Sequence, residues 1–228
     1  MKFVTYKNKI FLVDDGVLEP KKDAFFFYEH IVASKNDVVL DIGTGTGFYA
    51  IMIADKVKHV VSTDIDIRAV KNACKNVVLN GLEDKVEVLH GDMFEPVKGK
   101  KFDMVVCSLP QMPTPEWKIK EKIKSLADDG GIDGRELINR FIKSLKRYLD
   151  KNGRAYLFHF DFLDANKTIK MFKEEGLAAS VIASLECPPG RLTSERICHL
   201  NNLGFKLNRD VKTGDYTVKI DVIRALRK

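Results

Sequence analysis

The chain lacks a long apolar run, a signal peptide and any low-complexity segment, and each absence excludes a class of protein. No stretch approaches the roughly 18 consecutive apolar residues that a membrane span requires. The N-terminus has no apolar run followed by a small-residue cleavage site. Only 7 of the 228 residues are proline, whereas 45% are hydrophobic and 31% are charged, as in folded domains. We therefore predict a folded, cytoplasmic protein that does not enter a membrane.

The sequence is also poor in cysteine, and its 4 cysteines do not have the spacing of metal ligands. None of them forms a Cys-x-x-Cys pair. Cys74 and Cys107 lie within the apolar patterns of an expected helix and an expected strand, where unpaired cysteine is usually buried. We therefore expect buried free thiols and no metal site.

Neither sign of charge is in large excess. The net charge is +6, from 38 basic and 32 acidic residues. A basic balance favours an acidic partner such as RNA, but lysine-rich surfaces also serve solubility or heat resistance. Nothing in the pattern indicates DNA. A basic stretch beside Trp117 has two interpretations, a solvated helix face or a lid that faces RNA or an acidic protein. It contains Lys118, Lys120, Lys122 and Lys124.

Strands and helices alternate along most of the chain. A hairpin is expected over residues 2–6 and 10–13, followed by an apolar helix over residues 23–33. Continuous apolar segments are typical of a parallel sheet that is covered on both faces. They occur at residues 38–40, 59–63, 86–89, 102–106 and 155–160. The helices between them are predicted at residues 48–54, near 70–77 with an end at Asn80-Gly81, and at 135–149.

Capping residues suggest where the last of these helices begins and ends. Asp133 and Glu136 have the spacing of a capping-box variant at its start. Asn152-Gly153 is the expected end.

The last third of the chain has a different pattern. Helices are expected at residues 164–175 and 193–203, and extended segments at 178–185, 205–211 and 215–225. The final segment is expected to insert antiparallel into the sheet. The sequence thus predicts an α/β fold with a doubly wound, mostly parallel, Rossmann-like sheet, an antiparallel C-terminal strand and a short N-terminal hairpin.

The length of the chain suits one domain with one substantial core. We divide it into an N-terminal hairpin and helix (residues 1–35), a ligand-binding core (36–186) and a C-terminal helix with strands (187–228).

A glycine-rich loop follows the first strand of the expected sheet, over residues 41–47. Such a loop lets the backbone approach a ligand, and the next helix offers free N–H groups at its start. The loop is not a P-loop, because Phe48 and Tyr49 stand where lysine and serine or threonine are required. It is not the dinucleotide fingerprint either, because Phe48 replaces the third glycine. A purely structural turn is the alternative.

The loop matches the pattern Asp-x-Gly-x-Gly-x-Gly and resembles the S-adenosylmethionine motif of methyltransferases. This resemblance implies S-adenosylmethionine as the cofactor, with the glycines beside its methionine and ribose parts. A carboxylate at the strand end suits the ammonium group of such a ligand and would repel a pyrophosphate. The cofactor-binding residues expected in this loop are Asp41, Gly43, Thr44, Gly45, Thr46 and Gly47.

Acidic residues also end the next two strands. Asp64 lies about 20 residues past Gly43, where an acidic residue can bridge two ribose hydroxyls. Asp92 is expected to accept a hydrogen bond from the adenine amino group, with Ile65 and Met93 on the two adenine faces. Each aspartate alone is typical of a cap or turn. Together they indicate a ligand site, because parallel sheets bind ligands at the carboxyl ends of their strands.

The segment Ser108-Leu109-Pro110-Gln111 follows the fourth strand, where amino-methyltransferases carry Asn/Asp-Pro-Pro-Tyr/Phe. Residues 16–23 and the acidic, glycine-rich residues 128–134 are further points of similarity to one branch of these enzymes. The chain thus resembles the HemK-type glutamine methyltransferases and their "small" methyltransferase relatives over roughly residues 16–160.

The resemblance implies how a planar –NH2 group would be held for methylation. Ser108 stands where the family has asparagine, and Gln111 stands where it has an aromatic residue that packs on the substrate. The predicted catalytic residues are therefore Ser108, Pro110 and Gln111, and Ser108 is also expected beside the cofactor. Methyl transfer requires positioning and desolvation, so no catalytic histidine is needed.

The sequence leaves the methyl acceptor open. The first hypothesis is N-methylation of a macromolecule, either a protein glutamine or an RNA base. The altered acceptor segment favours a small-molecule methyltransferase, and a non-catalytic regulatory subunit that binds the cofactor would also fit. About 35 residues precede the first sheet strand, so the helical N-terminal domain of the bacterial enzymes is not expected. The chain is more similar to the short branch that works with a small zinc-binding activator.

Overall fold

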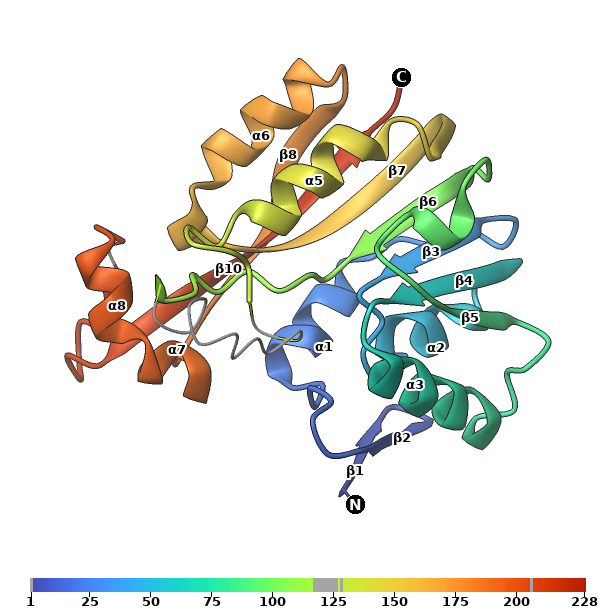
Figure 1. Ribbon diagram of the computed structural model, residues 1–228, viewed down its shortest axis with the longest axis horizontal. Helices are drawn as coiled ribbons and strands as arrows, with labels where there is room; N and C mark the ends of the chain where they lie inside the picture. The colour runs from blue at the N-terminus through green and yellow to red at the C-terminus, as the bar shows by residue number, and fades with distance from the viewer. Residues whose placement is uncertain (1, 117–126, 128, 206) are drawn as a thin grey trace.

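The central sheet of the computed structural model is mostly parallel (Figure 1). The structure describes residues 2–116, 127, 129–205 and 207–228. The strands of the sheet lie in the order β5-β4-β3-β6-β7-β10-β8, and β9 pairs with β10. The five consecutive parallel strands are β3 (Val38–Ile42), β4 (His59–Asp64), β5 (Val86–His90), β6 (Phe102–Cys107) and β7 (Leu149–Phe160).

The strand order reverses between β3 and β6, and this is where a doubly wound sheet opens a crevice. From β3 the chain passes to β4 and β5 on one side, and then returns to place β6 on the other side of β3. The connections after neighbouring strands therefore leave in opposite directions, and ligands bind at such a point. The predicted doubly wound fold is confirmed.

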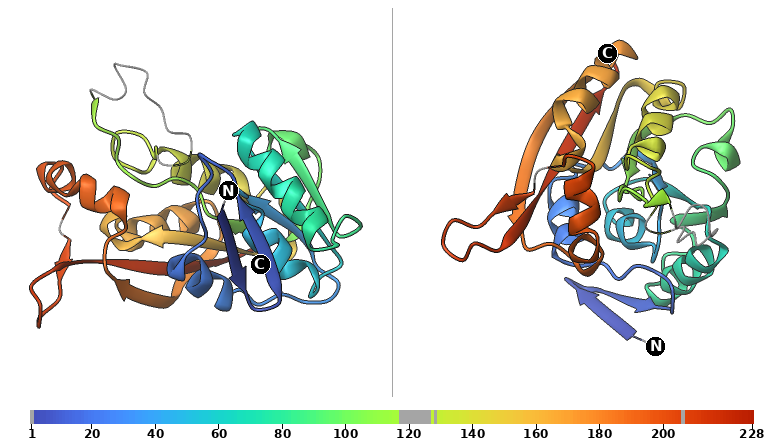
Figure 2. Two further views of the ribbon diagram at one scale, coloured as in Figure 1. Left: turned by 90° about the horizontal axis from the view of Figure 1, so that it is seen from below. Right: turned by 60° about the vertical axis from the view of Figure 1, so that its left-hand side comes forward.

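Helices cover both faces of the sheet (Figure 2). On one face, α1 (Lys22–Glu29), α2 (Phe48–Ala54) and α3 (Ile67–Leu79) pack over a core that includes Phe27 and Ile51. On the other face, α5 (Glu136–Leu145), α6 (Ala165–Glu174) and the short 3-10 helix η1 (Glu95–Val97) enclose Phe141 and Phe172. Within the described part of the chain, every helix is too short or too polar to cross a membrane.

The N-terminal hairpin is attached to α3 by a row of asparagines. The hairpin consists of β1 (Lys2–Tyr6) and β2 (Lys9–Val13), as predicted. The Asn76 side chain accepts the Leu12 N–H (2.7 Å) and donates to the Leu12 carbonyl (2.9 Å). Asn80 forms the same pair with Ile10, at 3.1 and 2.8 Å. Residues four apart lie on one face of a helix, so this row satisfies the free edge of β2.

The same asparagine row explains a wrong prediction for Cys74, which is exposed and not buried. The buried face of α3 contains Asn72, Ala73 and Asn76. Cys74 lies two residues from both asparagines, and residues two apart on a helix do not share a face. Cys107, in contrast, is buried at the end of β6 as expected.

Several element ends differ from the prediction. The α1 helix ends at Glu29 rather than at residue 33, and α5 ends at Leu145 rather than at residue 149. Asn152-Gly153 does not end a helix, because both residues lie inside β7. Asn152 has a φ of 66°, and the pairing of β7 with β6 shifts register nearby. The pair therefore marks an irregularity within a strand, which its turn-like composition does not distinguish from a helix end.

The predicted capping box of α5 is also absent. Asp133 Oδ1 accepts the backbone N–H of Arg135 (3.0 Å), and the helix starts one residue later, at Glu136.

The last strand inserts antiparallel into the sheet, as predicted. β10 (Tyr216–Leu226) lies between β7 and β8 (Ala178–Cys187), and the short β9 (Asn208–Arg209) pairs with its beginning. The 3-10 helix η2 (Asp161–Leu163) follows β7. The single helix expected over residues 193–203 is instead two helices, α7 (Arg191–Glu195) and α8 (Ile197–Asn202), which meet at Arg196.

Candidate functional site

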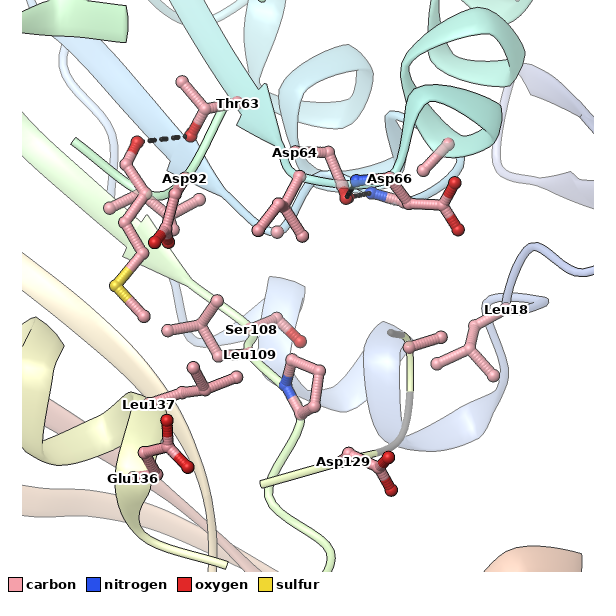
Figure 3. A pocket seen from close by; sticks show the side chains of 18 of the residues that line it. Leu18, Thr63, Asp64, Asp66, Asp92, Ser108, Leu109, Asp129, Glu136 and Leu137 are labelled. Atoms are coloured by element: carbon pink, nitrogen blue, oxygen red, sulfur yellow. Dashed lines mark hydrogen bonds between the residues drawn. The ribbon is translucent and has the colours of Figure 1, made fainter. Parts of the chain in front are cut away.

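A cavity of about 480 Å³ lies at the carboxyl ends of the parallel strands (Figure 3). This volume is within the range of small-molecule binding sites, roughly 300–1,000 Å³. The cavity is lined from the glycine loop after β3, the ends of β4 and β5, the segment after β6, and the start of α5. Eight of the predicted site residues line it: Gly43, Gly45, Asp64, Ile65, Asp92, Met93, Ser108 and Pro110.

The glycine loop adopts a backbone conformation that other residues rarely take. Gly43, Gly45 and Gly47 have φ values of 75°, 55° and 81°. A Cβ atom on Gly43 would lie 2.8 Å from the Ser108 carbonyl oxygen, so glycine allows the loop to pack against the segment after β6. No described atom lies within 4 Å of the position that a Cβ of Gly45 would take. The loop thus presents open backbone to the cavity.

Asp41 lies beneath this loop and does not line the cavity. Its side chain is completely buried, and its Oδ2 accepts a hydrogen bond from Thr44 Oγ1 (2.7 Å). Its Oδ1 has no hydrogen-bond partner among the described residues. Burial raises the pKa of Asp41 to about 7, although the Thr44 hydroxyl opposes this shift. Thr44, Thr46 and Gly47 also shape the loop without reaching the cavity.

Asp41 should make the stability of the protein depend on pH. Its pKa rises from 3.8 to about 7 on folding, so between these values the folded protein keeps a proton that the unfolded chain releases. The stability from this group is present below the lower value and is lost as the pH rises towards the upper one. The loss is about 1.4 kcal/mol per pH unit. We expect urea titrations to show wild type losing stability relative to Asp41→Asn between about pH 5 and about pH 6.5.

If the free energies of unfolding of wild type and Asp41→Asn differed by a constant amount over this pH range, the raised pKa of Asp41 would be contradicted. Other titrating groups are common to both proteins, so their contributions cancel in the comparison.

Asp64 is fixed at the cavity by two backbone N–H groups. Its Oδ2 accepts the Gly45 N–H (2.9 Å) and its Oδ1 accepts the Asp66 N–H (2.9 Å). The side chain therefore connects the glycine loop to the start of α3 (Figure 3). Burial raises the pKa of Asp64, and the two backbone N–H groups act in the opposite direction. Each oxygen retains lone-pair capacity for a further donor.

Asp92 and Met93 follow β5 and line the cavity, and Asp92 lies across the cavity from Leu18 (Figure 3). Asp92 forms an ion pair with Arg140 of α5 (2.5 Å). Met93 is held in a left-handed conformation (φ 49°), and its carbonyl accepts a hydrogen bond from Thr63 Oγ1 (2.9 Å). Ile65, after β4, is 47% exposed and offers an apolar surface to the same cavity.

The segment after β6 reaches the cavity through Ser108, Leu109 and Pro110. The Ser108 backbone N–H donates to the Ile42 carbonyl (3.2 Å), which ties the segment to the neighbouring strand. Burial raises the pKa of the Tyr49 hydroxyl, and a side-chain hydrogen bond with Ser108 counteracts this effect. The Ser108 side chain therefore lies between Tyr49 of α2 and the cavity.

Gln111, expected at the acceptor site, does not line the cavity. Its side chain is 2% exposed and turns towards the end of β7. Its Nε2 donates to the Phe158 carbonyl (2.6 Å), and its Oε1 accepts the Phe160 N–H (3.1 Å). The amide thus takes the place of a strand partner for β7 beyond the point where β6 ends. This placement does not support the predicted substrate contact.

A second loop, the acidic loop at residues 129–134, also lines the cavity. The Gly130 N–H donates to the Met112 carbonyl (3.0 Å), and the Thr114 N–H donates to the Gly131 carbonyl (2.9 Å). This loop contributes Asp129, Gly131 and Ile132 to the lining, and α5 contributes Glu136. A Cβ on Gly130 would lie 2.8 Å from the Gln111 backbone, so the acidic loop can approach the segment after β6 this closely only with glycine.

Several lining residues were not named as site residues from the sequence. Gly16, Val17 and Leu18 come from the segment before α1, and Asp129 and Glu136 come from the acidic loop and α5. Both segments have recognisable composition, but composition alone does not indicate which side chains face a cavity. The basic stretch at Lys118, Lys120, Lys122 and Lys124 beside Trp117 lies outside the described residues. Among the described residues, no histidine, cysteine, aspartate and glutamate side chains cluster as a metal site would require.

Comparison with known proteins identifies the family. The model of the methyltransferase small domain matches residues 21–119. A putative protein N5-glutamine methyltransferase of Methanocaldococcus jannaschii is 36% identical over 173 residues, which cover 75% of this chain and 86% of that protein. This chain belongs to the HemK-type methyltransferases. It is therefore a class I enzyme that depends on S-adenosylmethionine.

Other relatives of this HemK-type enzyme are longer. The release factor glutamine methyltransferase of Aquifex aeolicus is 32% identical over 158 residues, which cover 64% of this chain but only 56% of that protein. The chain thus spans little more than half the length of that relative.

Solved structures show the same fold. The Mtq2–Trm112 complex of E. cuniculi, whose title assigns it the methylation of the eRF1 translation termination factor, matches with a TM-score of 0.60 and 19% identity. The match covers 93% of this chain and 99% of that one. The tRNA m1G37 methyltransferase of M. jannaschii also matches, with a TM-score of 0.60 and 19% identity over 99% of this chain and 56% of that one. At these identities the likeness concerns the fold alone.

Proposed function

We propose that this HemK-type enzyme methylates the side-chain amide nitrogen of a glutamine in a protein. The observation that carries the proposal is that the glycine loop, Asp64 and the segment Ser108–Pro110 meet at one cavity. A nucleoside site and an acceptor site in one cavity are what direct methyl transfer requires, since the reacting atoms must be held about 3–3.5 Å apart.

The cofactor half of the cavity is formed by the glycine loop and the residues that follow β4 and β5, and it fits S-adenosylmethionine. Asp64 would hold the ribose hydroxyls, because its oxygens are fixed by Gly45 and Asp66 and keep acceptor capacity. Ile65 and Met93 would pack on the adenine, and Asp92 would accept a hydrogen bond from the adenine amino group. The open backbone at Gly45 would accommodate the methionine part.

Asp41 has a less direct role in this proposal. It does not reach the cavity, but its buried Oδ1 lacks a partner among the described residues. Its Oδ2 stabilises the loop through Thr44, and a cation nearby would favour the charged form of Asp41 against the effect of burial. Thr44, Thr46 and Gly47 would act by fixing the shape of that loop.

The acceptor half of the cavity is formed by the segment after β6 and the acidic loop. Here the protein has to orient an amide nitrogen and exclude water. The bound cofactor supplies a methyl group that is already activated by positive sulfur. The Ser108 hydroxyl and the carbonyl groups of Ser108 and Leu109 are hydrogen-bond acceptors for an –NH2 group. Pro110 and Leu109 provide apolar surface beside it. Positioning and desolvation would supply most of the rate enhancement.

The charge of the cavity favours a protein acceptor over RNA. The described charged residues that line it are one base, Arg140, and five acids: Asp64, Asp66, Asp92, Asp129 and Glu136. Asp66, Asp92 and Asp129 each pair with an arginine, which leaves Asp64 and Glu136 without such a pair among the described ion pairs. An acidic lining opposes the approach of phosphate groups and does not oppose a neutral amide. The names of the relatives agree, because they are glutamine methyltransferases of proteins.

Ser108→Ala should slow turnover without changing cofactor affinity. The substitution removes a hydroxyl from the acceptor half and leaves the glycine loop and Asp64 intact. We expect kcat for the acceptor to fall by about tenfold, the effect of losing one hydrogen bond in the reacting complex. Calorimetry with S-adenosylhomocysteine should give an unchanged Kd. Equal losses in kcat and in cofactor affinity would remove Ser108 from the acceptor site.

The proposed reaction is tested with methyl-labelled S-adenosylmethionine. The acceptors would be an eRF1-type termination factor, ribosomal protein uL3, bulk RNA and a small-molecule extract, each with and without a Trm112-type protein. Ribosomal protein uL3 is included because a relative in Bradyrhizobium diazoefficiens is named as its glutamine methyltransferase. Label in a protein, located to a glutamine by mass spectrometry, supports the proposal. Label only in RNA or in the small-molecule fraction contradicts it.

The same experiment addresses a partner subunit. We extend the proposal to a small activator, because the E. cuniculi structure was solved as a complex with Trm112. Activity that rises only in the presence of the Trm112-type protein supports this part. Activity that is the same without it contradicts the activator and leaves the acceptor assignment intact.

A further inference from the structure

The C-terminal helices α7 and α8 pack close to the acceptor half of the cavity. Leu200 of α8 is completely buried in the core on the α5 and α6 side of the sheet. Figure 1 shows the two helices at one end of the molecule. Arg196, at the junction of α7 and α8, is 4% exposed. A charged side chain is rarely buried to this degree unless partners hold it.

Arg196 contacts both loops that form the acceptor half. Its Nη1 donates to the Pro113 carbonyl (3.0 Å), and its Nη2 lies 3.5 Å from Asp129 Oδ1. Pro113 belongs to the segment after β6, and Asp129 belongs to the acidic loop that lines the cavity. One guanidinium therefore contacts two segments that are also joined by the backbone bonds of Gly130 and Thr114 and by a side-chain bond between Thr114 and Asp129.

Asp129 connects this arginine to the cavity. Its Oδ1 also accepts a hydrogen bond from Thr114 Oγ1 (2.8 Å), and both residues line the cavity. Its side chain is 13% exposed. The position of the carboxylate is thus set through its Oδ1, which both Thr114 and Arg196 contact.

The cluster retains unused hydrogen-bonding capacity. Asp129 Oδ2 and the Nε and Nη2 atoms of Arg196 are buried and have no hydrogen-bond partner among the described residues. Unsatisfied buried polar atoms of this kind are costly, and a purely structural ion pair normally satisfies them. The cluster therefore keeps polar capacity near the cavity that its own contacts do not use.

We propose that Arg196 is a positioning residue for the acceptor site, which it fixes through the Asp129 carboxylate and the Pro113 carbonyl. This inference rests on the proposed function only in placing the acceptor between the segment after β6 and the acidic loop. Asp129 would meet the N–H groups of the bound amide, because a carboxylate is an acceptor of hydrogen bonds only. The C-terminal helical segment thereby becomes part of the acceptor site.

The test compares variants by acceptor kinetics, cofactor affinity and amide hydrogen exchange. Arg196→Met keeps the length and apolar body of the side chain but removes its donors. Arg196→Lys keeps the charge but lacks the planar fork that reaches both partners. Arg191→Met is the matched control, because Arg191 lies on the same segment, is 89% exposed and pairs only with Glu195 in the described structure. Asp129→Asn keeps the shape of the carboxylate and removes its charge.

We expect Arg196→Met to lower kcat/KM for the labelled acceptor by about 10- to 100-fold, as for a small displacement of a positioning group. S-adenosylhomocysteine affinity should stay within about threefold, because no cofactor contact changes. The amides of Thr114 and Gly130 should exchange faster. Arg196→Lys should be intermediate and Arg191→Met unchanged. Asp129→Asn should match Arg196→Met, and the double variant should be no worse than either single variant, as for two residues in one interaction.

Two results would overturn the inference. One is unchanged acceptor kinetics in Arg196→Met, whether or not exchange rises, since the arginine would then be structural only. The other is an equal loss of cofactor affinity and acceptor turnover, which indicates general destabilisation. The kinetic comparison uses whichever acceptor the wild-type protein labels, and the hydrogen-exchange measurement needs no acceptor. A wrong acceptor class would therefore contradict the proposed function without hiding the result for Arg196.

Discussion

Asp64→Asn is expected to weaken S-adenosylhomocysteine binding by about 10- to 150-fold, or about 1.5–3 kcal/mol, the value of a hydrogen bond to a charged group. The substitution keeps the size of the side chain. It places an –NH2 group opposite one of the backbone N–H donors of Gly45 and Asp66, which now point at the two carboxylate oxygens. The loop and the start of α3 would separate at the point where the ribose is expected. Isothermal calorimetry measures the change directly.

Asp66→Asn is the matched control for this prediction. Asp66 lines the same cavity, but its carboxylate is bonded to the Arg68 side chain and caps α3 through the Arg68 N–H (2.9 Å). Asparagine also caps helices well, so cofactor affinity should change by less than about threefold. Equal losses in the two variants would mean that cavity charge alone matters, and the proposed ribose contact of Asp64 would be wrong.

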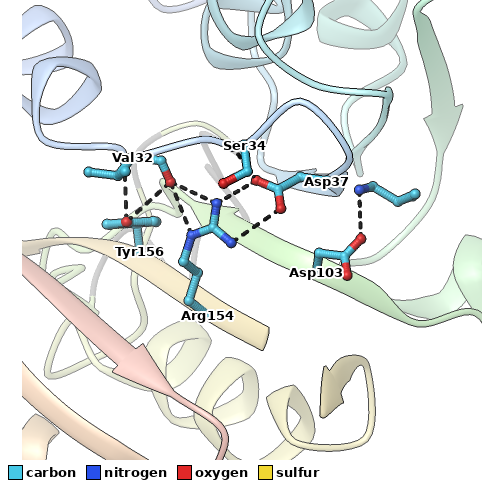
Figure 4. Close-up of polar contacts among 7 residues, drawn as sticks. Val32, Ser34, Asp37, Asp103, Arg154 and Tyr156 are labelled. Carbon is cyan, nitrogen blue, oxygen red and sulfur yellow. Dashed lines mark hydrogen bonds and ion pairs between the residues drawn. The ribbon is translucent and has the colours of Figure 1, made fainter. Parts of the chain in front are cut away.

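Arg154→Met should lower the free energy of unfolding by about 3–5 kcal/mol, because removing one partner of a buried ion pair leaves the other charge uncompensated. Arg154 forms an ion pair with Asp37 and donates from Nε (3.0 Å) and Nη2 (2.8 Å) to the Val32 carbonyl (Figure 4). The Arg154 and Asp37 side chains are 18% and 8% exposed. The cluster ties the segment after α1 to β7. Urea titration measures the loss.

Two further variants define the cause of this effect. Lys170→Met removes an exposed ion pair, with side chains 79% and 61% exposed, and should cost less than about 1 kcal/mol. Asp37→Asn added to Arg154→Met should recover part of the loss, because it removes the stranded charge. The cluster lies near the amino ends of β3 and β7, away from the cavity, so cofactor affinity of the folded variant should not change. A loss under about 1 kcal/mol for Arg154→Met would show that the pair is not a major support.

The acceptor segment illustrates the limit of the resemblance to the family. Ser108 and Pro110 line the cavity where the motif placed them, since the ends of parallel strands share one edge. Gln111 follows immediately in the sequence, yet its amide is used by the backbone of Phe158 and Phe160. Those partners are 47 and 49 residues away in the chain. No local pattern indicates that the side chain turns towards β7.

The glycine loop shows the same division. Its sequence predicted a close backbone approach, and the three positive φ angles confirm the conformation. Whether Asp41 reaches the cavity was not decided by the motif, because a strand residue points to one face or the other according to its register. In the fold its side chain is buried under the loop, and Asp64 is the acid that borders the open space.

By itself, the sequence determined the alternation of buried strands and helices, the doubly wound sheet and the edge at which the glycine loop and the acidic residues meet. These features follow from periodicity, turn residues and the rule that parallel strands share an end, all of which act over short stretches of chain. Only the tertiary structure decided which side chains face the cavity, which face of α3 is buried, and that Arg196 supports the acceptor loops. Such contacts join segments far apart in the chain, and they depend on register and packing that local residue patterns do not specify.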